Sequence, residues 1–434
     1  MTAEIAIYNK SAVALAADSA VTIAGDGVHK IYNGAEKLFA LSKQHPVGIM
    51  VYDSGSLCDV PWEIIIKQYR KHLGGNSFHY VQDYADDFWQ FLENHQLIIP
   101  DKFKKQSLRR LYNTIFHNEI IDGAEKLVKQ KIDEKKAPLT HSETYELLEE
   151  QCKRLTRAAV EEPFLNNFDE NDVKNARTYA STVATELCHT LLPHSIEAVP
   201  NSLIDAIEVL FSEIVCRKID IGNLTGVVFA GFGENEYFPA VHAFDVHGFL
   251  DKKLRLFKND NKSCTSGDVG LTAYAQDEEV TVFMSGISDK LHNKIKYENS
   301  NVFRKILSEV GAILDGNIKD EILKKQLKDQ VVNKAADLWG NANDKISALI
   351  KENYIDKVLG MIEFLPKQDL AEMAESLVNL TAFKRKVSDD SETVGGPIDV
   401  AIISKGDGFI WVKRKHYFEK ALNQHYFNNM ANGA

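Results

Sequence analysis

A threonine stands directly behind the initiator methionine, where it can become a nucleophile once Met1 is removed. Thr2 would then carry a hydroxyl and a free α-amino group on one residue, so the amine can accept the hydroxyl proton. An α-amino group has a pKa of about 8, which suits a general base at neutral pH. We therefore expect Thr2 Oγ to attack a carbonyl carbon.

Such a nucleophile needs a cation and a hydrogen-bonding carboxylate nearby, to keep the amine partly neutral and to stabilise developing negative charge. Asp18 ends the second predicted strand, and Lys37 begins the third. In a sheet of adjacent hairpins, both side chains can reach the beginning of the first strand. The sequence thus supplies both groups.

Strands are predicted to position these residues. The first fifty residues contain two hairpins, one joined by the turn Asn9-Lys-Ser11 and the other by residues 42–46. The patterns typical of strands return at 224–232, 240–244 and 279–284, with a turn at 245–248. A last hairpin is predicted from 398–404 and 409–413.

Helices are predicted between these groups of strands, in blocks at about 62–216 and 289–386. Thr140 and Glu143 make a capping box before one of these helices. Strand runs that are segregated from helix runs indicate an α+β fold, with a sheet sandwich flanked by helices. We find no linker and no short repeat, so a single domain over 1–434 is expected.

Composition excludes several classes of protein. The net charge of -11 argues against a general binder of nucleic acid or of anionic membranes. No signal peptide and no apolar run of membrane-spanning length is present, so a cytoplasmic protein is expected. The five scattered cysteines are expected to be reduced thiols.

His242, Asp245 and His247 are the candidates for a metal site. Strand alternation places Asp245 on the opposite face from His242, so we expect no metal there. No motif of a cofactor site is apparent either, and no cofactor is expected.

The spacing of the residues around Thr2 resembles a known family. Thr2, then Asp18 with Ser19-Ala-Val-Thr22, then Lys37-Leu-Phe39 is similar to the N-terminal half of β-type proteasome subunits and their bacterial relatives, which are N-terminal nucleophile hydrolases. Residues 225–233, 244–249 and 395–404 resemble later strands of the same family. The resemblance is collinear and covers core segments 2–60, 222–290 and 388–418.

The resemblance implies a four-layer α-β-β-α sandwich in which the two helical blocks are large insertions. It also implies roles for individual residues. The implied catalytic residues are Thr2, Asp18, Lys37, Ser285 (with Ser288 as the fallback) and Asp390. The implied substrate-binding residues are Thr22, for the substrate backbone, and Asp53, whose backbone N–H takes the place of the family's glycine oxyanion donor.

The expected function is therefore a threonine peptidase that cleaves peptides after Met1 removal exposes Thr2. Met1 removal suits a small second residue, and no propeptide is expected. Two alternatives remain open: an N-terminal nucleophile amidohydrolase acting on a small amide, and a catalytically inactive assembly protein, which Asp53 and Glu4 would favour. A homo-oligomer is expected, with an ATPase or another protein as a possible partner.

Overall fold

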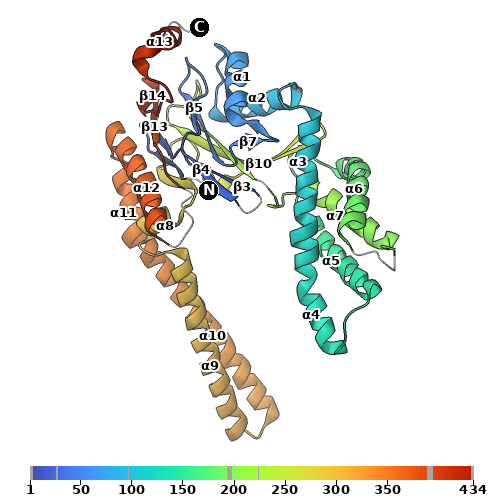
Figure 1. Ribbon diagram of the computed structural model, residues 1–434. Helices are drawn as coiled ribbons and strands as arrows, with labels where there is room; N and C mark the ends of the chain where they lie inside the picture. Colours follow the sequence, from blue (N-terminus) through green and yellow to red (C-terminus); the bar gives the residue numbers. More distant parts are fainter. Residues whose placement is uncertain are drawn as a thin grey trace. The chain divides into compact units, whose positions relative to one another are not determined.

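The computed structural model describes residues 3–25, 28–95, 97–192, 198–222, 224–388 and 394–431 (Figure 1). The chain divides into two compact units. Unit 1 comprises Met1–Asn33, Gly267–Ile402 and Trp411–Lys415, and unit 2 comprises Gly34–Ser266, Ile403–Ile410 and His416–Ala434. Two five-stranded antiparallel sheets and many helices confirm the α+β class. The single domain and the four-layer order of sheets and helices stay predictions.

The first sheet has the order β12-β1-β2-β13-β14, and most of its residues belong to unit 1. Its strands are β1 (Glu4–Tyr8), β2 (Val13–Ala17), β12 (Gly270–Ala275), β13 (Asp399–Ser404) and β14 (Gly408–Lys413). β1 and β2 form the predicted hairpin, in which Glu4 pairs with Ala17 and Tyr8 with Val13. Asn9 makes the turn, because its Oδ1 accepts hydrogen bonds from the N–H and the hydroxyl of Ser11.

Helix α12 (Lys367–Val387) packs along β1 and β2 in unit 1. Leu370, Ala374 and Val378 on this helix belong to the same buried cluster as Ile5 and Ile7 of β1. Burial of these apolar side chains is the main driving force that holds the hairpin on the helix. A separate two-stranded hairpin, β3 (Val21–Gly25) with β4 (Val28–Tyr32), follows β2.

A long helical hairpin also belongs to unit 1. It consists of α9 (Asp289–Asn317) and α10 (Glu321–Ile350), and Figure 1 shows the two helices running side by side. Phe303 stacks on Trp339 between them, with 5.2 Å between ring centroids. Neither helix contains a fully buried residue. A π-helical turn, Lys351–Ile355, and α11 (Asp356–Ile362) lead on to α12.

The sheet of unit 2 has the order β11-β10-β9-β6-β5. Its strands are β5 (Leu38–Ala40), β6 (Val47–Asp53), β9 (Thr225–Gly231), β10 (Ala240–Leu250) and β11 (Lys253–Lys258), and a small hairpin of β7 (Ser56–Leu57) and β8 (Val60–Pro61) follows β6. Helices α1 (Trp62–Leu73) and α2 (Val81–Asn94) supply an aromatic core with the sheet. In that core Phe88 and Trp89 each lie 5.5 Å from the ring of Phe229 on β9.

The helices between α2 and β9 form a second core of their own in unit 2. They are α3 (Asp101–Thr114), a π-helical segment (Ile115–Asp122), α4 (Gly123–Lys135), α5 (His141–Glu161), α6 (Glu170–Leu191) and α7 (Asn201–Cys216). The predicted capping box of α5 is confirmed. Glu143 N–H donates to Thr140 Oγ1 at 3.2 Å, and Thr140 N–H donates to Glu143 Oε2 at 2.8 Å.

Two sequence predictions in these regions are wrong. Residues 279–284 form no strand but lie in helix α8 (Glu278–Ser285), where Lys384 of α12 pairs with Glu279 at 2.7 Å and Gly286, with φ of 73°, ends the helix. Residues 245–248 form no turn, since β10 runs through them. Gly248 adopts a φ of 100° beside a register shift, which lets the strand continue as far as Leu250.

Membrane-spanning helices and disulfides are both absent from the described residues. None of the helices in the described ranges combines the length and the apolar character that a bilayer span requires. No two of the five cysteines, all of which lie in those ranges and are buried, form a disulfide.

Candidate active site

Asp18 is the centre of a hydrogen-bond network in unit 1. Its side chain is 1% exposed and lies just beyond the end of β2. Oδ1 accepts the N–H of Ala3 at 3.2 Å, and Oδ2 accepts the N–H groups of Ala20 at 3.3 Å and Gly395 at 2.9 Å. Three backbone N–H groups share one buried carboxylate. Asp18 thus joins the start of β1 to a segment that is far away in the sequence.

Backbone contacts reinforce this junction. Asp18 N–H donates to Ala3 O at 3.1 Å, and Ser19 N–H donates to Gly395 O at 3.2 Å. The Ser19 hydroxyl also donates to Pro397 O. Gly396 has a φ of 77°, and a Cβ there would lie 2.8 Å from Cβ of Asn33. Glycine is therefore required at the second position of the Gly-Gly pair.

Three of the predicted site residues lie wholly or partly outside the described residues. Thr2 and Asp390 lie outside them completely, and Thr22 is described as backbone only, in β3, where it pairs with Ile31 of β4. Thr2 directly precedes Ala3, whose N–H Asp18 binds. Asp390 lies five positions before Gly395 in the sequence.

Lys37 belongs to unit 2 and directly precedes β5. Its side chain is 5% exposed. Its carbonyl oxygen accepts the N–H of Val51 at 2.8 Å, which ties the residue to β6. The neighbouring Glu36 lies 3.4 Å from Lys67 of α1. Because Asp18 belongs to unit 1, each of the two residues is described within its own unit, and their predicted contact stays a prediction.

Asp53 ends β6 with a left-handed backbone conformation. Its φ is 62°, which glycine adopts without strain and aspartate tolerates better than most residues. The side chain is exposed, and its Cα is paired with Thr225 of β9. Partial loss of solvent around the carboxylate raises the pKa of Asp53, while the nearby positive charge of Lys262 acts in the opposite direction.

The residue before Asp53 is held by a contact that sequence reasoning missed. Tyr52 donates its hydroxyl hydrogen to Asp245 Oδ1 at 3.0 Å, and Asn259 donates to Oδ2 of the same aspartate at 2.8 Å. The Tyr52 ring lies on Gly226, its paired residue on β9, where an added Cβ would be 1.7 Å from the ring. The glycine opposite a large aromatic residue was the available signal in the sequence.

Ser285 is the last residue of α8. Its hydroxyl lies 2.7 Å from the carbonyl oxygens of both Thr281 and Ile287, and it accepts the N–H of Ile287 at 3.4 Å. The fallback residue, Ser288, accepts the N–H of Leu291 at 3.3 Å and caps α9. Both hydroxyls therefore close the turn between two helices, which is a local structural role.

The candidate metal-binding histidines lie on β10 in unit 2. Burial lowers the pKa of His242 to about 4 and that of His247 to about 3, so both imidazoles are neutral at pH 7. In the part of the chain that the structure describes, no group of three or more metal-ligating side chains comes together. The structure thus offers no described residues that could hold a metal at Asp18 or at these histidines.

Comparison with known proteins gives similarity at the level of structure. No protein-family model matches the sequence, and no curated protein matches it. The structure is similar to a Gly-1 mutant of Anbu from Hyphomicrobium sp. strain MC1, with a TM-score of 0.28 and 10% identity over 100% of this chain and 92% of that chain. It is also similar to Anbu from Yersinia bercovieri, with a TM-score of 0.27 and 8% identity over 99% and 95% of the two chains.

The Yersinia protein is described as an ancestral beta-subunit. Within unit 1, the candidate site is defined by the contacts of Asp18 with Ala3, Ala20 and Gly395.

Proposed function

We propose that this chain is a threonine-type N-terminal nucleophile hydrolase that cleaves amide bonds in peptides. The observation that carries the proposal is the carboxylate of Asp18, buried and bound to the N–H of Ala3. This bond fixes the backbone of the residue that follows Thr2. Removal of Met1 would leave Thr2 as the first residue, at a point where the chain is already anchored.

In this mechanism Thr2 Oγ attacks the carbonyl carbon of the scissile amide, and the α-amine of Thr2 takes its proton through a bridging water. The tetrahedral intermediate then collapses: the C–N bond breaks, the α-amine passes the proton to the leaving amine, and an ester of Thr2 remains. Water hydrolyses this ester, which releases the acid half of the substrate and restores the hydroxyl. Lys37 lowers the pKa of the α-amine and stabilises the developing charge, while Asp18 holds Lys37. A carboxylate can accept about four hydrogen bonds, so three backbone donors are compatible with an ammonium on the same group.

Two residues would bind the substrate. The N–H of Asp53 would donate to the oxyanion, and Thr22 would bind the substrate backbone from β3. The side chain of Asp53 is exposed to solvent, which reduces the repulsion that an oxyanion would meet. Ser285 and Asp390 would complete the hydrogen-bond network. A single domain with a four-layer sandwich and a cytoplasmic location belong to the same proposal.

Variants of Thr2 test this proposal. We expect the full-length protein to hydrolyse a fluorogenic peptide panel and to be inhibited by a peptide boronate. Thr2→Ser keeps a hydroxyl and should retain measurable activity, whereas Thr2→Ala should lose it at unchanged thermal stability. Equal turnover by the wild type and Thr2→Ala would refute the role of Thr2. Turnover of small amides but not of peptides would favour an amidohydrolase instead.

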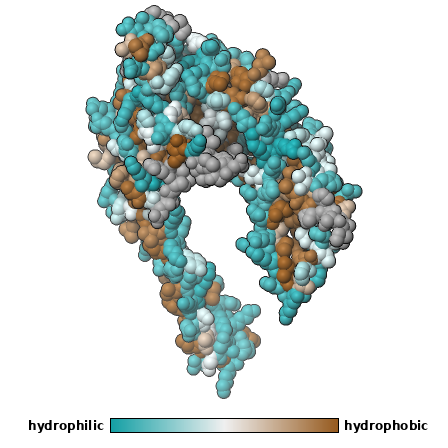
Figure 2. Space-filling model, viewed as in Figure 1, coloured by the Kyte–Doolittle hydropathy of each residue, from teal (hydrophilic) through white to brown (hydrophobic). Residues whose placement is uncertain are grey.

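A second candidate function is an assembly role without catalysis, and the α9–α10 hairpin favours it. Large apolar side chains lie exposed on both helices, and brown patches mark this hairpin in Figure 2. They include Leu291, Ile295, Val302, Ile306 and Ile313 on α9 and Ile322, Leu323, Val332, Leu338, Ile346 and Leu349 on α10. On α9 they recur at spacings of four and seven residues, which places them on one stripe.

The partner that this stripe fits is a second copy of the same chain. Residues 289–350 contain eleven lysine and arginine residues against nine aspartate and glutamate residues, while the whole chain carries -11. The near balance of charge on the hairpin gives little repulsion between two copies and little attraction for nucleic acid, so the exposed apolar stripe is the feature that favours self-association. Two hairpins side by side would form a four-helix bundle that covers the exposed stripe.

Solution mass tests this assembly role. Light scattering after size exclusion should give a multiple of the 48.8 kDa chain mass, and Ile306→Glu should reduce it. Ser308→Glu, exposed on the same helix away from the stripe, is the matched control and should leave the mass unchanged. Identical masses for the wild type and Ile306→Glu would refute self-association through the hairpin.

A further inference from the structure

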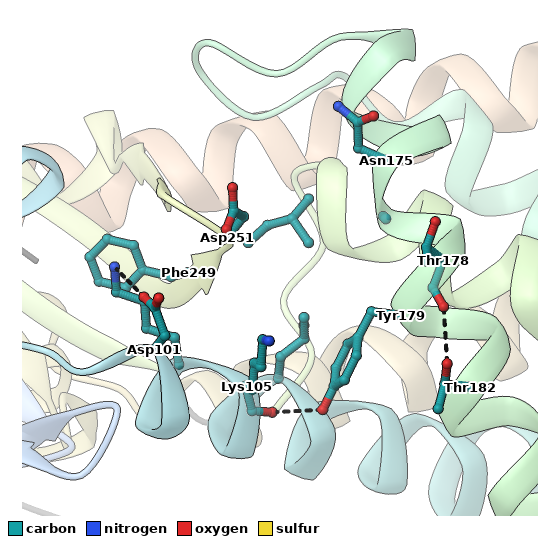
Figure 3. Close-up of a pocket in the computed structure, with 12 residues that line it drawn as sticks. Asp101, Lys105, Asn175, Thr178, Tyr179, Thr182, Phe249 and Asp251 are labelled. Atoms are coloured by element: carbon teal, nitrogen blue, oxygen red, sulfur yellow. Dashed lines mark hydrogen bonds and ion pairs between the residues drawn. The ribbon is translucent and has the colours of Figure 1, made fainter.

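A cavity of about 370 Å³ lies within unit 2, between α3, α6 and the end of β10 (Figure 3). Its volume is within the range of small-molecule sites, which begin at about 300 Å³. Two lysines and two aspartates are among the residues that line it: Lys104 and Lys105 on α3, Asp101 at the start of α3, and Asp251 just after β10. The proposed hydrolase reaction uses none of these residues.

Lys104 is the unusual member of this set. The residue is only 4% exposed, and its Nζ has no hydrogen-bond partner among the described residues. Nζ lies 4.5 Å from the centre of the Phe249 ring and 3.8 Å from Asp101 Oδ1. The second distance is too long for a hydrogen bond, and the Asp101 side chain is 72% exposed. A buried ammonium in this state lacks the hydrogen bonds that normally offset its desolvation.

The opposite wall of the cavity is polar. Thr178, Tyr179 and Thr182 line it from α6, at spacings that place them on one side of the helix. The Tyr179 hydroxyl donates to the carbonyl oxygen of Lys105 at 3.1 Å and so ties α6 to α3. In Figure 3 the side chain of Lys105 extends from α3 toward the space between Tyr179 and Asp251.

We propose that this cavity binds a small zwitterion, namely an α-amino acid or the free end of a short peptide. Lys104 Nζ is covered in the unliganded structure, so the ligand carboxylate would displace the exposed Asp101 side chain to become the counter-ion of Lys104, and it would also meet Lys105. The ligand ammonium would bind Asp251 and the released Asp101. Two cations and two anions in one cavity match a ligand that carries one charge of each sign, whereas a simple anion would face two carboxylates without a partner.

This assignment predicts opposite effects of one substitution on stability and on binding. Lys104→Met keeps the buried methylene stem and removes an ammonium that has no hydrogen bond. It should therefore leave the unliganded protein as stable as the wild type or more stable. The same substitution should abolish binding of the zwitterion. A lysine that merely supported the fold would instead lower the melting temperature when replaced.

Isothermal titration of the full-length protein with four probes tests the proposal. L-leucine and glycylglycine carry both charges, whereas N-acetyl-leucine and leucine amide each lack one of them. We expect heat from at least one of the first pair and none from the second pair. Binding of leucine alone would identify an amino acid as the ligand, and binding of glycylglycine alone would identify a peptide end.

The variants complete the test. Lys104→Met and Lys105→Met should each weaken binding at least tenfold, as should Asp251→Asn. Lys102→Met, on the exposed side of the same helix, is the matched control and should bind as the wild type does. The proposal is overturned if neither zwitterion binds, if N-acetyl-leucine binds as well as leucine, or if Lys104→Met binds unchanged. Thr2→Ala should bind normally, which separates this site from the proposed hydrolase reaction.

Discussion

Replacement of Asp18 by alanine is the perturbation whose consequence the structure defines best. The substitution removes the acceptor of three backbone N–H groups, those of Ala3, Ala20 and Gly395, at 3.2, 3.3 and 2.9 Å. Leaving a buried donor unsatisfied costs about 1–3 kcal/mol. Two of the three bonds are long and their losses are not additive, so we expect a total of about 3–5 kcal/mol.

Amide hydrogen exchange detects this loss locally. The chain has two compact units, so one global unfolding free energy is less informative than exchange of the affected peptides. At about 1.4 kcal/mol per factor of ten, exchange of the peptides that contain β1 and Gly395 should accelerate by at least about a hundredfold. Exchange of α2 in unit 2 should stay unchanged.

Asp329→Ala is the control, because Asp329 is exposed on α10 and its replacement should alter stability by no more than about 0.5 kcal/mol. Exchange in Asp18→Ala that equals the wild-type rates at β1 and Gly395 would refute the view that this carboxylate joins the two segments.

Three further predictions concern stability. Gly226→Ala would place a methyl group 1.7 Å from the Tyr52 ring and should lower the free energy of unfolding, measured by chemical denaturation, by about 3 kcal/mol. Gly340→Ala is the control: a Cβ there meets nothing within 4 Å, so the substitution should leave the free energy of unfolding unchanged or raise it. Burial, and after it the charge of Arg255, lowers the pKa of His247 to about 3 in the folded state, against about 6.5 in the unfolded state. The contribution of neutral His247 to the free energy of unfolding is therefore complete above pH 6.5 and is lost as the pH falls toward 3. His247→Phe should make the free energy of unfolding less dependent on pH in this range, and an unchanged pH profile would contradict the assignment. Thr140→Ala should lower the melting temperature through loss of about 1 kcal/mol of capping at α5, which an unaltered temperature would disprove.

The hairpin of β1 and β2 was predictable because local rules determine it. Two short apolar runs joined by an asparagine turn predict the hairpin, and the hairpin places Asp18 just beyond the end of β2, close to the start of β1. The contact of Asp18 with Gly395 was not predictable by such rules, since it joins residues that are far apart in the chain. The resemblance to the proteasome family pointed to both residues, and the structure shows the hydrogen bond from the N–H of Gly395 to Asp18 that connects them.

Helix α8 shows where periodicity fails. Residues 279–284 contain β-branched and aromatic residues, which favour a strand, and the run is too short for its period to decide. Contact with α12, including the ion pair between Glu279 and Lys384, selects the helix. The strand that forms the edge of the sheet beside β1 is β12. Its first three residues include a glycine and a threonine, so its sequence predicts a strand less strongly than residues 279–284 do.

Lys104 shows the same limit for a candidate binding site. In the sequence it belongs to a charge-rich helix, for which a solvated face is the ordinary interpretation. Its burial depends on Phe249, which lies on β10 and reaches it only in the folded chain. A cavity of this kind has no sequence motif, because residues from α3, α6 and β10 share it.

Mass analysis of the N-terminal peptide, before and after incubation of the full-length protein with a peptide epoxyketone, tests the proposed hydrolase most directly. We predict that Met1 is absent, that Thr2 is the first residue, and that Thr2 carries the adduct, with no adduct in Thr2→Ala. A fully retained Met1, or a free Thr2 that stays unmodified while the adduct forms elsewhere, would contradict the role of Thr2 as the nucleophile.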